Sequence, residues 1–185
     1  MEGQGHISSF IAKPFAGTDE EIENLARRVR ELLVTRLRVN PSGSAVGEFL
    51  SSSVALLGGT IVVSNAPTPA EEPGGSLTIE PGGKSFVIRL SPYTSPIRDH
   101  FTIGHELGHF FLHYEHRNPP DVAVSFHRYG SGPIETQANR FSAALLMPKA
   151  EFLQKMAEFE QDTYALAGYF GVSEPAVRIR SQYVT

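Results

Sequence analysis

The sequence predicts an α+β fold, in which a small antiparallel sheet of about three strands packs with one motif-bearing helix and several further helices. Three observations lead to this prediction. A long stretch of helical periodicity comes first, short β-branched segments lie between residues 60 and 90, and apolar stripes separated by proline and glycine follow up to residue 183. At 185 residues, 41% of them hydrophobic, the chain suits one domain with a sizeable core.

The first helix is expected from about Thr18 to Arg38. Thr18 and Glu21 have the spacing of a capping box, in which each side chain accepts a hydrogen bond from the backbone N–H of the other residue. Apolar residues then recur at helical spacing, which favours an amphipathic helix packed on a core: Ile22, Leu25, Ala26, Val29, Leu32, Leu33 and Leu37. The turn-forming residues 40–43 end this helix.

Three short strands are expected after a second helix over residues 46–57. Residues 60–63 are β-branched and form the first strand. Residues 65–75 contain three prolines and two glycines, which predicts a loop. Strands over Ser76–Glu80 and Lys84–Leu90 follow, and the turn residues between them predict a hairpin.

The rest of the chain is predicted to be helical. Ser95 and Pro96 provide a capping hydroxyl and a first-turn proline for a helix that should run to about Tyr114. Residues 117–132 are expected to form an exposed loop. Apolar spacing then predicts helices over residues 134–147, 149–160, 163–170 and 174–183.

Composition and charge exclude several classes of protein. The chain has no cysteine, which rules out disulfides, thiolate metal sites and cysteine nucleophiles, and fits a reducing compartment. The formal net charge of −4 provides no overall attraction for nucleic acid or anionic lipid. Residues 1–10 lack the pattern of a secretory signal, and no apolar run is long enough to span a membrane. We therefore expect a soluble, cytoplasmic protein.

The helix expected after Ser95 carries an HExxH motif, His105-Glu106-Leu107-Gly108-His109. Residues four apart on a helix lie about 40° apart around its axis, so the two imidazoles can bind one metal ion. Glu106 points about 100° away from His105, where its carboxylate can act as the general base on an attacking water. Gly108 costs the helix about 1 kcal/mol relative to alanine, which suggests close approach of another backbone or of substrate.

A catalytic zinc site needs a third protein ligand, and three residues are candidates. The metzincin pattern requires a histidine at position 115, which holds Glu115, so that arrangement fails. His113 lies four residues beyond His109, but the helix turns it about 80° away from His105, which favours a packing or hydrogen-bonding role. Glu135 lies in the first turn of the next helix, after a loop long enough to fold back. Two histidines and one glutamate leave a fourth position for water.

Asn139 follows Glu135 by four residues and shares its face of the helix. There its side chain can hydrogen-bond a ligating imidazole and fix its orientation. The alternative for both residues is an ordinary solvated helix start, where an acidic side chain is favourable in any case. The spacing alone leaves this alternative open.

Two dense stretches give the chain a family resemblance. Residues 98–109 are similar to the pattern R-x-x-F-T-x-A-H-E-L-G-H, and residues 135–148 to E-x-x-A-N-x-F-A-x-x-L-L-M-P. Both patterns are typical of the ImmA/IrrE family of zinc metallopeptidases, which the chain resembles over roughly residues 18–185. Gly104 departs from the pattern, since alanine is commoner there.

The resemblance implies a zinc site and a kind of substrate. It implies that His105, His109 and Glu135 are the zinc ligands and that Glu106 is catalytic. We expect a zincin-like metallopeptidase core over residues 1–150 and a C-terminal helical segment over residues 151–185, which has the shape of a helix-turn-helix and packs on the core. The resemblance also implies cleavage of a helix-turn-helix transcriptional repressor, often encoded nearby, which derepresses stress or mobile-element genes.

Three functions are therefore compared. The favoured one is a zinc-dependent endopeptidase whose strand Lys84–Leu90 pairs with an extended substrate. The second is a DNA-binding regulator, but Arg178 and Arg180 are few cations for a recognition helix, so direct binding to nucleic acid is not expected. The third is a partner-titrating scaffold with an inactive metal site, against which the intact Glu106 counts. Manganese also fits two histidines and a carboxylate, and the sequence does not predict an oligomeric state.

Overall fold

A computed structural model of the chain describes residues 12–65, 74–114, 116–117, 119–127 and 132–184. The helices are α1 (Asp19–Leu37), α2 (Ala45–Leu56), α3 (Pro96–Leu112), α4 (Pro133–Leu146), α5 (Lys149–Glu158), α6 (Thr163–Phe170) and α7 (Glu174–Val184). The strands are β1 (Gly59–Val63), β2 (Ser76–Ile79), β3 (Phe86–Leu90) and β4 (Val124–His127). The α+β class is confirmed. Most of the loop predicted over residues 65–75 lies outside the described residues.

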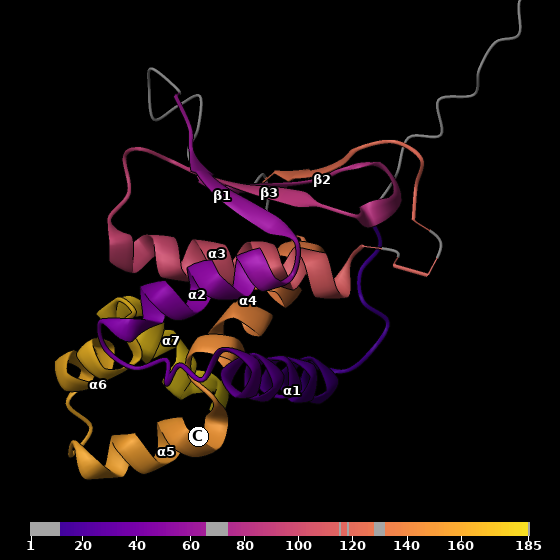
Figure 1. The fold of residues 1–185 in the computed structure, drawn as a ribbon. Coiled ribbons are helices and arrows are strands. Elements are labelled where there is room, and N and C mark those ends of the chain that lie inside the picture. Colours follow the sequence, from indigo (N-terminus) through magenta and orange to yellow (C-terminus); the bar gives the residue numbers. More distant parts are fainter. Residues whose placement is uncertain (1–11, 66–73, 115, 118, 128–131, 185) are drawn as a thin grey trace, which may run out of the picture.

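The four strands form one mixed sheet that lies on one side of the helices (Figure 1). Their order is β1-β3-β2-β4. β2 pairs antiparallel with β3 and β4, whereas β1 runs parallel to β3. The sheet thus has one strand more than the three expected, and one of its pairings is parallel although an antiparallel sheet was expected. Because β3 has a neighbour on both sides, the prediction that Lys84–Leu90 receives a substrate strand is wrong.

The additional strand, β4, lies within residues 117–132, which were expected to form an exposed loop. That prediction is wrong for residues 124–127, because Val124 and Phe126 are buried against the core. The strand is only four residues long, and its partner β2 lies about 50 residues earlier, with Ile79 opposite Val124. β4 is an edge strand of the sheet, as is β1.

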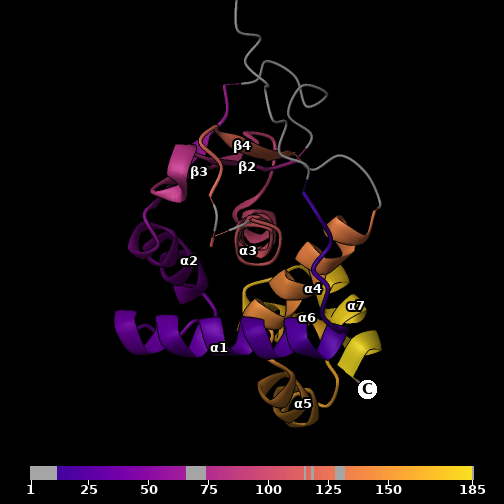
Figure 2. The ribbon, with the colours of Figure 1, turned by 90° about the vertical axis from the view of Figure 1, so that its right-hand side faces the viewer.

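The helix with the HExxH motif is the centre of the molecule. Figure 2 looks along α3, with the sheet on one side and α2, α1 and α4 around the remainder. Residues 102–110 are all buried, which is the burial expected of a helix surrounded by other elements. Ser95 caps the helix by accepting a hydrogen bond from the Arg98 N–H, as predicted, and the helix ends at Leu112 rather than at Tyr114.

Two glycines bring α3 and α4 into close contact. A Cβ atom on Gly108 would lie 2.9 Å from the Ala138 Cα atom, so only glycine fits against that backbone. A Cβ atom on Gly104 would lie 2.5 Å from the Ser142 hydroxyl oxygen, which itself donates a hydrogen bond to the Phe101 carbonyl. The expected close approach of another backbone at Gly108 is therefore present, and the approaching element is α4.

The first and last helices close the molecule around this centre. The predicted capping box of Thr18 and Glu21 is present at the start of α1. In α7 the Arg180 side chain is fully buried, donates to the Met147 carbonyl at 2.9 Å and pairs with Glu23 of α1. Arg178, two positions away, is exposed. Within the described ranges, no helix has both the length and the apolar character to cross a membrane.

Candidate metal centre

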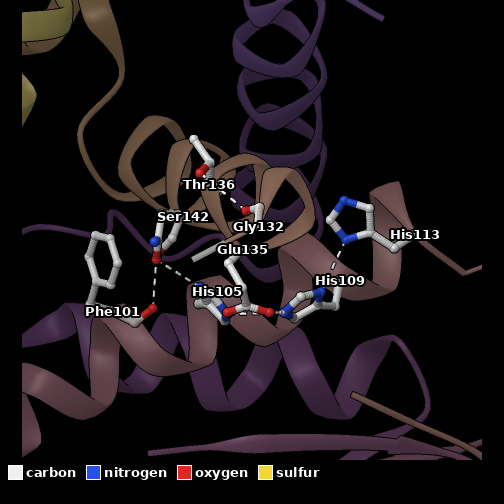
Figure 3. Close-up of polar contacts among 9 residues, drawn as sticks. Phe101, His105, His109, His113, Gly132, Glu135, Thr136 and Ser142 are labelled. Atoms are coloured by element: carbon white, nitrogen blue, oxygen red, sulfur yellow. Dashed lines mark hydrogen bonds and ion pairs between the residues drawn. The ribbon is translucent and has the colours of Figure 1, made fainter. Parts of the chain in front are cut away.

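Three ligand-type side chains from α3 and α4 meet at one point. His105 and His109 lie on the face of α3 that α4 covers, and Glu135 in the first turn of α4 lies between them (Figure 3). The histidines are buried and Glu135 is partly buried, and the ligand atoms of all three lie within 4.8 Å of one another. The structure thus brings together the three residues for which the sequence predicts metal binding.

The distances within this group fit a tetrahedral zinc ion. The two Nε2 atoms are 3.0 Å apart, and the Glu135 carboxylate oxygens lie 3.2 Å from His105 Nε2 and 3.3 Å from His109 Nε2. Ligands bonded at about 2.0–2.1 Å in a tetrahedron lie about 3.3–3.4 Å apart. The donor set therefore needs little rearrangement to hold such an ion.

Glu135 is held in its charged form by the two imidazoles. Its burial raises the pKa, but the hydrogen bonds and charges of His105 and His109 together outweigh that effect and hold the pKa of Glu135 well below its usual range. A carboxylate is the form that binds a metal ion, so the protein keeps Glu135 in the ligating state.

A second residue of α4 orients the first histidine. Asn139 Oδ1 lies 2.8 Å from His105 Nδ1, so the Nδ1–H of the imidazole donates to the amide oxygen. When Nε2 gives up the proton that bonds Glu135, the lone pair of His105 lies on Nε2 and can bind a metal ion. The predicted contact between Asn139 and a candidate ligand is present in the structure.

The second histidine also has a partner at Nδ1, and it is His113. The two Nδ1 atoms are 3.0 Å apart, and His113 Nε2 lies 3.1 Å from Gln137 Oε1. Burial lowers the pKa of His113 to about 4, so its imidazole is neutral near pH 7. His113 stays outside the ligand group, as expected, but it hydrogen-bonds a member of that group.

The proposed general base lies beside the start of β2. Glu106 is fully buried, and a Cβ atom on Gly75 would lie 3.1 Å from its Oε1 atom and 2.3 Å from the Thr102 methyl group. Gly75 therefore leaves room for the carboxylate between α3 and the sheet. A cavity of about 770 Å³ is lined by Thr102 of α3, Asn139 of α4 and Ile179 of α7, among others.

The sequence predicted the three candidate ligands but not every residue that holds them in place. The i, i+4 spacing of the histidines and the first-turn position of Glu135 made these residues candidates, and the family resemblance implied the full ligand set. Gln137 was missed, because its contacts to His113 and to the chain before α1 depend on tertiary structure. Glu115, rejected as a ligand, lies outside the described residues.

The comparisons with known proteins are consistent with this geometry. The IrrE N-terminal-like domain family model matches residues 61–182, which is more than half of the chain. No curated protein matches the chain. A solved structure of a Mycobacterium tuberculosis transcriptional regulator is similar, with a TM-score of 0.60 and 19% sequence identity over 86% of this chain. The match covers 46% of that protein, so this chain spans less than half its length, and the likeness shows the fold alone.

Proposed function

The chain belongs to the IrrE N-terminal-like domain family, and on this premise we propose that it is a zinc-dependent endopeptidase. The observation that carries the proposal is the close group of His105 Nε2, His109 Nε2 and the Glu135 carboxylate. The two nitrogens are 3.0 Å apart, one carboxylate oxygen lies 3.2 Å from His105 Nε2, and the other lies 3.3 Å from His109 Nε2. Zinc suits a nitrogen-rich set with an open position, and manganese is the alternative ion.

The residues around these three candidate ligands support hydrolysis of a peptide bond. A zinc ion held there would polarise the substrate carbonyl and lower the pKa of the attacking water. The Glu106 carboxylate, adjacent in sequence to His105, takes the proton of that water and passes it to the leaving amine. Its full burial excludes bulk water from this exchange and strengthens its electrostatic effect.

The edge strand β4 is the proposed binding place for an extended substrate. Phe126 of β4 stacks on His109, with ring centroids 5.0 Å apart, so β4 runs next to the metal ligands. β4 pairs with β2 and ends the strand order β1-β3-β2-β4. A substrate strand added there would bind through main-chain hydrogen bonds, which supports action on a protein.

The proposed substrate is a helix-turn-helix transcriptional repressor, which the family resemblance implies. The similar solved structure is of a protein described as a transcriptional regulator, in keeping with a role in transcription. Cleavage of a repressor would release stress or mobile-element genes, and it would take place in the cytoplasm, where the repressor binds DNA.

The decisive experiment compares the parent chain with Glu106→Gln. Both proteins are loaded with one equivalent of Zn²⁺, and each is incubated with a helix-turn-helix repressor encoded next to this chain. We expect the parent to cleave the repressor at a defined bond, found by mass spectrometry, and a chelator to stop it. Glu106→Gln should keep its zinc and lose cleavage, because the amide cannot accept the proton.

A control variant and a DNA-binding assay separate the endopeptidase from a DNA-binding regulator. Arg178→Ala, on an exposed face of α7, should cleave at the parental rate. Zinc retention with undiminished cleavage by Glu106→Gln would refute the mechanism. A salt-dependent shift of duplex DNA without any cleavage would favour a regulator, although Arg180 has its guanidinium inside the protein and bonded to Glu23.

A further inference from the structure

The two candidate histidine ligands are held by different hydrogen-bond partners. His105 is held by Asn139, which lies on the same helix as Glu135. His109 is held by His113, which is 5% exposed and follows α3 directly. His113 in turn contacts Gln137, and the Gln137 amide is bonded to Phe15, 122 positions earlier in the chain. The proposed function assigns no role to these three residues.

The hydrogen bonds that link His109, His113, Gln137 and Phe15 allow one consistent assignment of donors and acceptors. If His109 Nε2 faces a metal ion, its lone pair is there, and its Nδ1–H must donate to His113 Nδ1. His113 then carries its hydrogen on Nε2 and donates it to Gln137 Oε1 at 3.1 Å. The Phe15 N–H donates to the same oxygen at 2.9 Å, while Gln137 Nε2 donates to the Phe15 carbonyl at 2.9 Å. The amide is therefore fixed in one orientation.

We infer that His113 and Gln137 are positioning residues that hold the His109 imidazole with Nε2 towards the metal, and that the Phe15 backbone fixes their orientation. This inference rests on the proposed metal site. A ligating imidazole whose other nitrogen has an oriented partner loses less freedom on binding, and such partners typically change metal affinity by about 10–100-fold. His113 and Gln137 thus fix the orientation of the His109 imidazole, as Asn139 fixes that of His105.

Packing alone is the competing explanation for His113. Its ring fills buried space and lies 5.1 Å from the His109 ring, centroid to centroid, so any side chain of suitable size satisfies that explanation. Asn and Leu have nearly the same shape, but only Asn places an acceptor where Nδ1 now lies. The pair His113→Asn and His113→Leu therefore separates hydrogen bonding from packing.

The experiment measures Zn²⁺ affinity by competition with a chromophoric chelator. We expect His113→Leu to bind Zn²⁺ about 10–100-fold more weakly than the parent chain, and His113→Asn to recover most of that affinity. Gln137→Leu, one bond further from the ligand, should weaken binding by a smaller factor. The double variant His113→Leu with Gln137→Leu should be no weaker than His113→Leu alone, since both act through the same nitrogen.

The controls separate this inference from the metal site itself. His116→Ala removes a histidine near the same helix end that bonds the Phe110 carbonyl, and it should bind Zn²⁺ like the parent. Thermal unfolding without metal verifies that each variant is folded. Absence of Zn²⁺ binding by the parent would overturn both proposals. Parental binding with equal affinities of folded His113→Leu and His113→Asn would overturn this one alone.

Discussion

Burial controls the charge of His113, the residue that contacts a candidate ligand without being one. Its neutral imidazole can accept a hydrogen bond from His109, whereas the protonated ring can only donate. Helix spacing predicted that His113 lies apart from the candidate ligands, and in the structure it lies outside the group of His105, His109 and Glu135. The spacing did not reveal the contact with His109, because helix spacing describes directions around an axis and not the rotamers that join two rings.

The stability of the metal-free protein should depend on this histidine in acid. The folded pKa of His113 is about 4, below the ordinary value of 6.5, so from pH 6.5 down to 4 the unfolded chain binds a proton that the folded chain does not. Stability should therefore fall as the pH decreases through this window, by up to about 3 kcal/mol from this group. Urea unfolding in chelator should show a weaker pH dependence for His113→Leu than for the parent. Equal slopes would contradict the prediction.

Gly75 should be required for activity and not for metal binding. A methyl group there would meet Thr102 and the Glu106 carboxylate, which must shift away from its present position. We expect Gly75→Ala to lower kcat at least about tenfold while Zn²⁺ affinity stays within about twofold, since small displacements of a general base are costly. Gly168→Ala adds the same group to α6 where it meets nothing within 4 Å, and this variant should keep parental kcat.

At the scale of elements, the contact between α3 and α4 determines the geometry of the site, because the ligands come from both helices. Gly104 and Ser142 are two departures from the family patterns given above, and they touch each other. The common pattern has alanine at both positions, whereas here the serine hydroxyl occupies the space that an alanine methyl at 104 would need. We therefore expect the two positions to be coupled, so that a larger residue at 104 requires a smaller one at 142.

This pair predicts a rescue between substitutions. Gly104→Ala should destabilise the fold by about 1–3 kcal/mol, because the added methyl overpacks the contact. Ser142→Ala should lose about 1 kcal/mol with its hydrogen bond to Phe101. The double variant should be more stable than Gly104→Ala alone, since the methyl then has room. Additive losses in chemical unfolding would disprove this coupling.

The elements also show where sequence patterns suffice. The caps at Thr18 and Ser95 act within four residues, so both helix starts were predictable. The hairpin of β2 and β3 was predictable for the same reason. The parallel direction of β1 and the existence of β4 were not, because both depend on pairing with strands more than 20 residues away.

At the scale of the whole molecule, α7 is attached to α1 by a buried ion pair between Arg180 and Glu23. The Arg180 side chain has no exposed surface, and that of Glu23 is 22% exposed. The sequence presented Arg180 as a candidate for contact with DNA, since a charge pattern alone does not distinguish an exposed arginine from one paired inside. The division at residue 150 remains a prediction, and the family match runs across it.

Loss of this ion pair should destabilise the entire fold. Arg180→Ala leaves Glu23 and the Met147 carbonyl without their donor, and we expect a loss of about 3–5 kcal/mol in the free energy of unfolding. Arg178→Ala removes an exposed arginine two positions away and should cost no more than about 0.5 kcal/mol. Thermal or urea unfolding measures both losses. Similar losses in the free energy of unfolding would contradict a larger contribution of the buried ion pair.

The pairing of Glu23 with Arg180 also has a consequence for the order in which the protein matures during synthesis. Glu23 of α1 is synthesised 157 positions before its partner Arg180. Until residue 180 has emerged from the ribosome, Glu23 of α1 and the carbonyl of Met147, which follows α4, lack the guanidinium group that they bond in the folded protein. The contacts that join α1, α4 and α7 therefore form only after α7 has been made, which is later than the synthesis of α3 and α4, the helices that carry the ligand group.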